Sequence, residues 1–185
     1  MSNIGREFPS EMETYIDKKS GVEGTRLTKT GTNVHFYFTE NSFTLGDEEI
    51  IFWHKDGHIT DPSSPRNLFS MDLKTGKRVQ LTEFEKDFKS VERITKSPDS
   101  KYFVFLGDGD LYCIDRVKNE TRLLYRAPVG YTLGATSISY DCRYVAVIAN
   151  DDITLHAASL NENYRGFKEN FYAHKNGYII IAQDI

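Results

Sequence analysis

Histidines are the first residues to search for metal or acid–base chemistry, and this sequence contains five of them. They are His35, His54, His58, His156 and His174. No two stand as His-x-His, and none shares a helical face with a carboxylate at the spacing that metal sites use. From these spacings we expect no metal ligands among the residues of this chain.

The sequence signatures of nucleophilic and phosphate chemistry are also missing. There is no Gly-rich phosphate loop, no Gly-x-Ser-x-Gly elbow and no Cys-x-x-Cys pair. Asp72 and Asp115 recur at matching places, each followed by turn residues, so we expect their carboxylates to bond their own turn backbones. The sequence therefore predicts no catalytic residue.

Four residues are candidates for binding a polar substrate. His35, Tyr37 and Thr39 alternate along an expected strand, so one face of that strand carries all three. His54 and Arg66 flank a long loop, and the planar guanidinium of an arginine suits a carboxylate. The alternatives are a hydrogen-bonded His35 without a ligand and a solvated loop charge at Arg66. We take His35, Tyr37, His54 and Arg66 as the candidate binding set.

The elements that would position these residues form repeated pairs of strands. Segment 67–82 has an alternating run, a Lys-Thr-Gly turn and a second alternating run, which is the pattern of a hairpin. The same pattern returns at 110–124 and at 14–28, and its first strand alone returns at 178–185. A repeated unit of this kind has to be identified before any fold is assigned.

A second element precedes the hairpins. A polar turn containing Asp47, Asp99 or Asp141 leads each time into a short apolar strand. The three aspartates are 52 and 42 residues apart (47 to 99 and 99 to 141), which is typical of β-propeller blades. A plain antiparallel sandwich with coincidental turns is the alternative.

We therefore expect an all-β fold of four-stranded antiparallel propeller blades in one partial domain, 1–185. Blades are expected at 33–82 and 91–126, with a partial blade at 134–185. The hairpin at 14–28 is of the kind that closes a propeller ring. Because rings typically need four to eight blades, about three blades indicate an incomplete ring, roughly the front half of a longer protein.

One stretch departs from the strand pattern. Leu160, Tyr164, Phe167 and Phe171 recur at helical spacing, which predicts a short helical insertion near 160–173. A surface helix that covers a blade is one interpretation, and a partner-binding helix is the other.

Composition narrows the class of partners. The 185 residues carry a net charge of −4 and a pI near 5.7, so there is no basic field for nucleic acid. No apolar run is long enough to cross a membrane, and residues 1–20 lack a signal-peptide core. The two cysteines could form one bridge at most, so we expect a cytoplasmic protein.

Several of these segments together resemble one enzyme family. They are Tyr15-Ile16-Asp17, Ser20-Gly21, Thr25-Arg26-Leu27-Thr28, Phe36-Tyr37-Phe38, Ser42-Phe43-Thr44, Val129-Gly130-Tyr131 and Phe167-Lys168-Glu169-Asn170-Phe171-Tyr172. In this order they resemble the N-terminal half of the oligogalacturonate lyases, and they cover nearly the whole chain.

The resemblance implies a seven-bladed propeller that degrades pectin in the cytoplasm. It implies β-elimination on short galacturonides, a small acidic oligosaccharide as the partner, and manganese as the cofactor of the complete enzyme. The family holds the metal with a His and Gln cluster in later blades, which also carry the catalytic His and Arg. None of those motifs stands in this sequence, so we expect this chain alone to be inactive.

Two function classes remain open. The chain is either the N-terminal portion of such a polysaccharide lyase or a non-catalytic binding or scaffold module of the TolB-like propeller type. A third hypothesis, the propeller cap of a peptidase, would need a hydrolase domain. An open half-ring could also form a homo-dimer that hides its edge strands.

Overall fold

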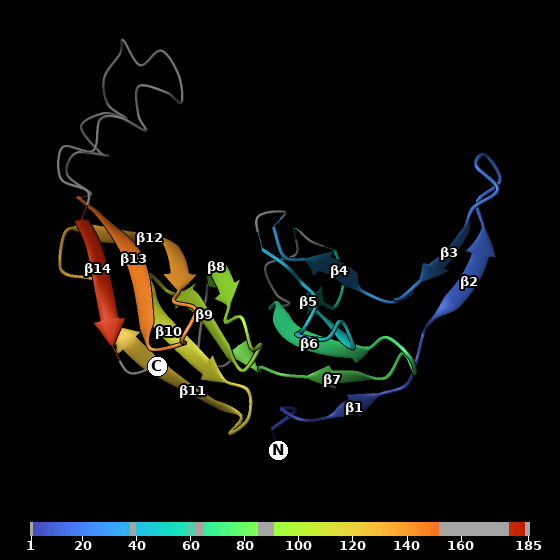
Figure 1. Ribbon diagram of the computed structural model, residues 1–185, viewed down its shortest axis with the longest axis horizontal. Helices are drawn as coiled ribbons and strands as arrows, with labels where there is room; N and C mark the ends of the chain where they lie inside the picture. Colours follow the sequence, from blue (N-terminus) through green and yellow to red (C-terminus); the bar gives the residue numbers. More distant parts are fainter. Residues whose placement is uncertain are drawn as a thin grey trace, which may run out of the picture. The chain divides into compact units, whose positions relative to one another are not determined.

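The computed structural model describes residues 2–37, 40–58, 60, 65–84, 91–151 and 178–183 (Figure 1). The fourteen elements formed by these residues are all β-strands, and every pair of neighbouring strands is antiparallel. The expected all-β, antiparallel fold is therefore confirmed. The helix predicted near 160–173 lies outside the described residues. Within the described residues, no helix has the length and apolar character needed to cross a bilayer.

The chain divides into two compact units, Met1–Lys89 and Ser90–Ile185, which are described one at a time. The first is built on a five-stranded sheet. Its strands, in spatial order, are β1 (Glu7–Phe8), β7 (Arg78–Gln80), β6 (Asn67–Asp72), β5 (Glu49–Lys55) and β4 (Thr32–His35).

Strands β5 and β6 lie inside this sheet because their side chains are apolar on both faces. Ile51 and Leu68 are fully buried on one face, and Phe52 and Phe69 pair on the other with their ring centroids 6.1 Å apart. The second face is completed by Met71 and by side chains from outside β5 and β6, among them Phe8, Met12 and Leu27. Strand β1 was not predicted, because two residues are too few to show an alternating pattern.

A separate hairpin follows β1 in the same unit. Strands β2 (Glu13–Ile16) and β3 (Glu23–Arg26) pair only with each other among the described strands, and nearly all of their residues are exposed. This is the hairpin predicted at 14–28. A two-stranded hairpin has little stability of its own, so the contacts at its base are important.

The second unit contains two sheets. The four-stranded one has the order β11 (Glu120–Tyr125), β10 (Asp110–Asp115), β9 (Tyr102–Gly107) and β8 (Val91–Lys96). The three-stranded one has the order β12 (Tyr131–Ile138), β13 (Tyr144–Asp151) and β14 (Tyr178–Gln183).

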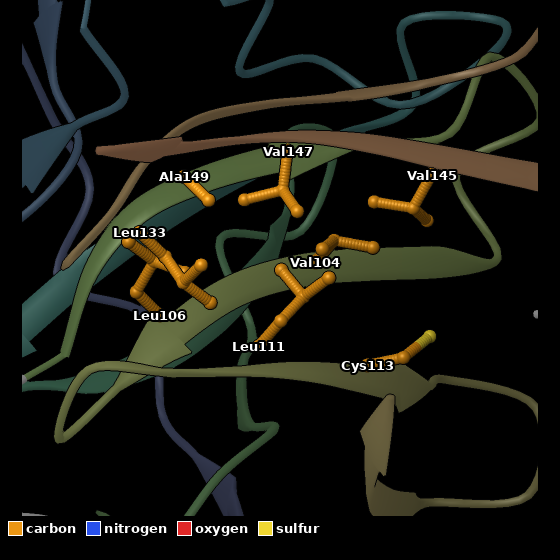
Figure 2. Packing of buried hydrophobic residues seen from close by; sticks show 8 residues of the cluster. All are labelled: Val104, Leu106, Leu111, Cys113, Leu133, Val145, Val147 and Ala149. Atoms are coloured by element: carbon orange, nitrogen blue, oxygen red, sulfur yellow. The ribbon is translucent and has the colours of Figure 1, made fainter. Parts of the chain in front are cut away.

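These two sheets pack against each other through one apolar core, which Figure 2 shows from close by. Strands β9 and β10 contribute to one side, and strands β12 and β13 contribute to the other. Its buried members are Val104, Leu106, Leu111, Cys113, Leu133, Val145, Val147 and Ala149. Each fully buried aliphatic side chain contributes about 1.5–3 kcal/mol, so this core holds the two sheets of the unit together.

Asp72 and Asp115 accept hydrogen bonds from their own turns, as predicted, and Asp17 does the same. Oδ1 of Asp72 accepts from the amides of Lys74 at 3.0 Å and Thr75 at 2.6 Å. Oδ1 of Asp17 and of Asp115 accepts from the amides two and three residues further on in the same way. Turn amides lower the pKa of the Asp17 and Asp72 carboxyls, the largest contribution coming from the second of the two amides.

The same turns need a left-handed residue four positions after the aspartate. Gly21, Gly76 and Asn119 occupy it, with φ of 72°, 71° and 55°. At Gly76 space is also limiting, because a Cβ would overlap the side chains of Ser10 and Met12. A Cβ at Gly21 would meet nothing within 4 Å.

The polar turns that lead into the apolar strands also repeat, but the first of them aligns with the others one position away from the predicted match. The amides of Asp47, Ser100 and Cys142 each donate a 2.9 Å hydrogen bond to the carbonyl three residues earlier, and their φ values lie between 56° and 61°. These three residues are equivalent, so Asp47 corresponds to the residue after Asp99 and after Asp141. The predicted alignment of Asp47 with those aspartates is wrong by one position, because the left-handed residue defines the turn.

Candidate functional site

His54 is the candidate whose surroundings are best defined. Its side chain, 13% exposed, stands on β5 opposite Asn33 of β4, and its Nδ1 lies 2.8 Å from Asn33 Oδ1. The side-chain Nδ2 of Asn33 donates a hydrogen bond to the carbonyl of Thr30 at 2.8 Å. The side-chain oxygen Oδ1 is therefore the atom of Asn33 that accepts from His54. Nδ1 of His54 therefore donates to Asn33, and Nε2 points to the Asp56 carboxylate, whose Oδ1 lies 3.3 Å away.

The imidazole of His54 is held by packing as well as by this hydrogen bond. The ring meets Phe69 edge to face at a centroid distance of 5.0 Å. Gly31 lies against its other side with φ +66°, and a Cβ there would stand 2.6 Å from His54 Cε1. Glycine at position 31 thus makes room for the ring.

His35 and Tyr37 do not continue one strand as predicted. Strand β4 ends at His35, and the next amide, that of Phe36, donates to the hydroxyl of Ser42 at 2.9 Å. Tyr37 follows outside the strand and is 70% exposed, while position 39 lies outside the described residues. His35 is exposed and lies opposite Phe52.

The pairing of β4 with β5 nevertheless brings two members of the candidate set, His35 and His54, to one face of the sheet. Asn33 faces His54 and His35 faces Phe52, and residues two apart on a strand share a face. His35 and His54 therefore stand on the same face of the first sheet. Arg66 is exposed and directly precedes Asn67, which is the residue of β6 opposite His54.

A cavity of about 180 Å³ opens on this face. Its wall combines residues of the N-terminal segment with ends of three neighbouring strands: Asn3, Arg6, Phe8, His54, Asp56, Pro65, Asn67, Phe69 and Gln80. Of the candidate set, only His54 lines it. Sequence reasoning missed Arg6, Asn67 and Gln80, and the available signal was that Asn67 is a polar residue at the start of a largely apolar strand.

The polar groups of the cavity are partly engaged with one another. Arg6 Nη1 lies 3.4 Å from Asn3 Oδ1, and the guanidinium stands 5.0 Å above the Phe8 ring. Asp56, with 94% of its side chain exposed, approaches His54 Nε2 to 3.3 Å. The cavity thus presents one cation, one carboxylate and a histidine.

A second polar cluster ties the hairpin base to the sheet. Glu11 pairs with Arg78 of β7 at 2.7 Å, and their side chains are 16% and 7% exposed. Glu11 also accepts hydrogen bonds from the amides of Lys29 and Thr30, at 2.7 and 3.1 Å, and from the Thr30 hydroxyl at 2.6 Å.

These bonds change the acidity of Glu11. Partial burial alone raises the pKa of its carboxyl, but the bonds from Thr30 and Lys29 and the charge of Arg78 outweigh that, and the pKa falls from 4.5 to about 2. Nε of Arg78 is buried and has no hydrogen-bond partner among the described residues. Glu11 is therefore the main acceptor that compensates this buried guanidinium.

A metal site would need several ligating side chains close together. Across the part of the chain that the structure describes, no three His, Cys, Asp or Glu side chains gather closely enough to hold an ion.

Comparison with curated proteins found lyases, whereas no family model matches the chain. An oligogalacturonide lyase of Pectobacterium atrosepticum is 29% identical over 142 residues, which is 75% of this chain and 34% of the relative. The oligogalacturonate lyase of Dickeya dadantii gives the same identity and coverage. The chain spans about a third of the length of these relatives.

Two solved structures are similar as well. An oligogalacturonate lyase in complex with manganese matches with a TM-score of 0.67 and 25% identity, over 83% of this chain and 39% of that one. The oligogalacturonate lyase of Vibrio parahaemolyticus matches with a TM-score of 0.75 and 21% identity, over 97% of this chain and 46% of that one.

Proposed function

We propose that this chain, which is related to the oligogalacturonate lyase family over part of its members' length, forms the first blades of a propeller lyase that acts on short galacturonides. The observation that carries the proposal is the 29% identity over three quarters of the chain. The fold agrees, because a solved lyase matches nearly all of the chain.

In this proposal the sheets are blades of one partial propeller domain, 1–185. Strands β4 to β7 form the blade at 33–82, and β8 to β11 form the blade at 91–126. Strands β12 to β14 begin the blade at 134–185, and the β2–β3 hairpin at 14–28 belongs to the blade that closes the ring. The repeated strand order and the repeated aspartate turns support this division.

The proposed reaction is a β-elimination. A base removes the proton on the carbon α to the uronate carboxylate, the bond to the glycosidic oxygen breaks, and a carbon–carbon double bond forms. The leaving oxygen takes up a proton, so the step is balanced without an oxidant. We assign the base and the metal ligands of this reaction to residues beyond those of this chain.

The role of this chain is then to bind the acidic substrate. His35 and His54 stand on one face of the first sheet, and Arg66 adjoins the residue opposite His54. A uronate carboxylate is a suitable partner for Arg66, because guanidinium and carboxylate form paired hydrogen bonds. Tyr37, which is exposed beyond the end of β4, would contact the sugar.

We also place the protein in the cytoplasm. Cys113 and Cys142 are both free, and burial raises the pKa of the Cys113 thiol to about 11, so this thiol is protected from oxidation. An acidic chain with this composition is suited to a small-molecule partner rather than to nucleic acid.

The test is a chimera in which this chain replaces the matching segment of the Pectobacterium lyase. Ultraviolet absorbance of the unsaturated uronate measures elimination of digalacturonate. We expect an active chimera, and we expect His35→Ala and Arg66→Ala each to raise KM about tenfold with a smaller change in kcat. His58→Ala is the matched control, because His58 is an exposed histidine bonded to Thr60.

Two outcomes would count against the proposal. A chimera that is folded by circular dichroism but inactive would favour the non-catalytic binding module. An active chimera whose KM is unchanged by both substitutions would keep the lyase assignment and remove His35 and Arg66 from the site.

A further inference from the structure

We propose that the cavity on the first sheet is a binding site for one small hydroxylated carboxylate, with Arg6 as the carboxylate anchor. The site goes beyond the proposed function, because it needs no elimination chemistry. It also uses residues outside the candidate set, with the exception of His54. The ligand class follows from the groups that line the cavity.

Arg6 supplies the only positive charge that is permanent in this wall. The one hydrogen bond of its side chain among the described residues, to Asn3 Oδ1, is long at 3.4 Å. Its guanidinium lies over the Phe8 ring at 5.0 Å, which supports the planar group and leaves its edge available. A guanidinium edge binds a carboxylate through two parallel hydrogen bonds. The neighbouring Arg78 cannot take this role, because it is paired with Glu11.

At the floor of the cavity, one hydrogen-bond donor and one hydrogen-bond acceptor have no partner among the described residues. Asn67 and Gln80 are 8% and 7% exposed. Asn67 Oδ1 accepts from the Thr82 hydroxyl at 3.2 Å and from the Phe84 amide at 2.7 Å, and Gln80 Nε2 donates to the Thr82 carbonyl at 2.7 Å. These bonds fix both amides, and Asn67 Nδ2 and Gln80 Oε1 have no partner among the described residues. A hydroxyl group, which donates and accepts, satisfies both.

Asp56 favours a ligand that carries hydroxyl groups. Its carboxylate stands at the cavity wall beside His54 Nε2, at 3.3 Å. It repels the anionic group of any ligand, which therefore belongs at Arg6, but it accepts hydrogen bonds from hydroxyl groups. A molecule with its carboxylate at Arg6 and its hydroxyls toward Asp56, Asn67 and Gln80 fits every one of these groups.

The cavity has room for one small molecule. A volume of about 180 Å³ corresponds to roughly six water molecules, which is enough for a single sugar acid. The rings of Phe8 and Phe69 form apolar parts of the wall, where the C–H groups of a sugar ring would lie.

The test is calorimetric titration of the 185-residue chain with D-galacturonate, D-galactose and acetate. Galactose lacks the carboxylate and acetate lacks the hydroxyls. We expect saturable binding of galacturonate and affinities at least tenfold lower for the other two. Arg6→Gln is expected to weaken galacturonate binding at least tenfold, because it removes the paired hydrogen bonds.

Arg26→Gln is the matched control, because Arg26 is an exposed arginine of the same unit, 60% exposed and away from the cavity. It is expected to leave binding unchanged. No saturation by about 10 mM galacturonate would overturn the proposal. So would equal affinity for all three probes, or binding that is lost in Arg66→Ala but kept in Arg6→Gln. Since this titration needs no turnover, an inactive lyase chimera would leave its result intact.

Discussion

Replacing Glu11 by glutamine should destabilise the first unit more than any other single charge removal near the hairpin. Glu11 combines an ion pair to Arg78 with three hydrogen bonds from Lys29 and Thr30. Glutamine keeps the size of the side chain and one acceptor oxygen. The substitution therefore removes the charge while changing little else.

The magnitude follows from the acidity of the group. The difference between a pKa of 4.5 and one of about 2 corresponds to roughly 3 kcal/mol, at about 1.4 kcal/mol per pH unit. Glu11 is 16% exposed, so solvent screens part of this, and glutamine retains part of the hydrogen bonding. We expect Glu11→Gln to lower the free energy of unfolding by about 2 kcal/mol near neutral pH.

The pH dependence gives a second, independent signature. A carboxyl whose pKa is lowered by folding stabilises the folded state above its unfolded pKa. For Glu11 this contribution is complete above about pH 5 and is lost as the pH falls through 4.5 toward 2. The Glu11→Gln variant lacks that titration, so the two stability curves should converge in acid.

The assay is urea unfolding followed by tryptophan fluorescence. Trp53 is the single tryptophan of the sequence and lies on β5, against Phe84 at 6.1 Å, so its signal reports the first unit. Glu13→Gln is the control, because Glu13 is half exposed and pairs with Lys29 on the surface. Equal stability of Glu11→Gln and the parent chain, or parallel curves from pH 5 to pH 2, would refute the reasoning.

Three further predictions concern the turns and the core. Gly76→Ala should lose more thermal stability than Gly21→Ala, because both incur about 1–2 kcal/mol for the left-handed backbone but only Gly76 also lacks space for a Cβ. Asp115→Ala should lower the free energy of unfolding by about 1 kcal/mol and Asp115→Asn by less, because asparagine keeps the Oδ1 acceptor. Under native conditions at about pH 8 a thiol reagent should label Cys142 and spare the buried Cys113, as measured by mass spectrometry, and denaturation should expose both. Equal losses for the two glycines, an Asp115→Asn variant as unstable as Asp115→Ala, or native labelling of Cys113 would contradict these accounts.

Local turn chemistry is the part of the structure that the sequence predicts best. Asp17, Asp72 and Asp115 bond the amides of their own turns, so their role depends on only a few consecutive residues. The order of hairpin-connected strands could be predicted for the same reason, because short hairpins leave few other ways to connect neighbouring strands. The shift at Asp47 shows the limit, since an acidic residue in a turn can occupy either of two adjacent positions.

The cavity could not be predicted, because it joins residues that no local pattern relates. Arg6 and Phe8 come from the N-terminal segment around a two-residue strand, whereas His54, Asn67 and Gln80 come from three other strands. Strand β1 is recognisable only by its pairing with β7, through Glu7 and Val79. The four predicted binding residues were chosen within single segments, and only His54 lines the cavity.

The N-terminal segment therefore has two roles that the sequence does not separate. Through Glu11 it neutralises the buried Arg78 and fixes the base of the β2–β3 hairpin. Through Arg6 it brings a guanidinium to the open end of the sheet face, at the wall of the cavity. Both roles depend on β1 lying beside β7, so the strand that shows no alternating pattern in the sequence positions Arg6 and Glu11. The charged part of the cavity wall is thus determined by the pairing of an edge strand, whereas the floor of the cavity comes from the strands beside it.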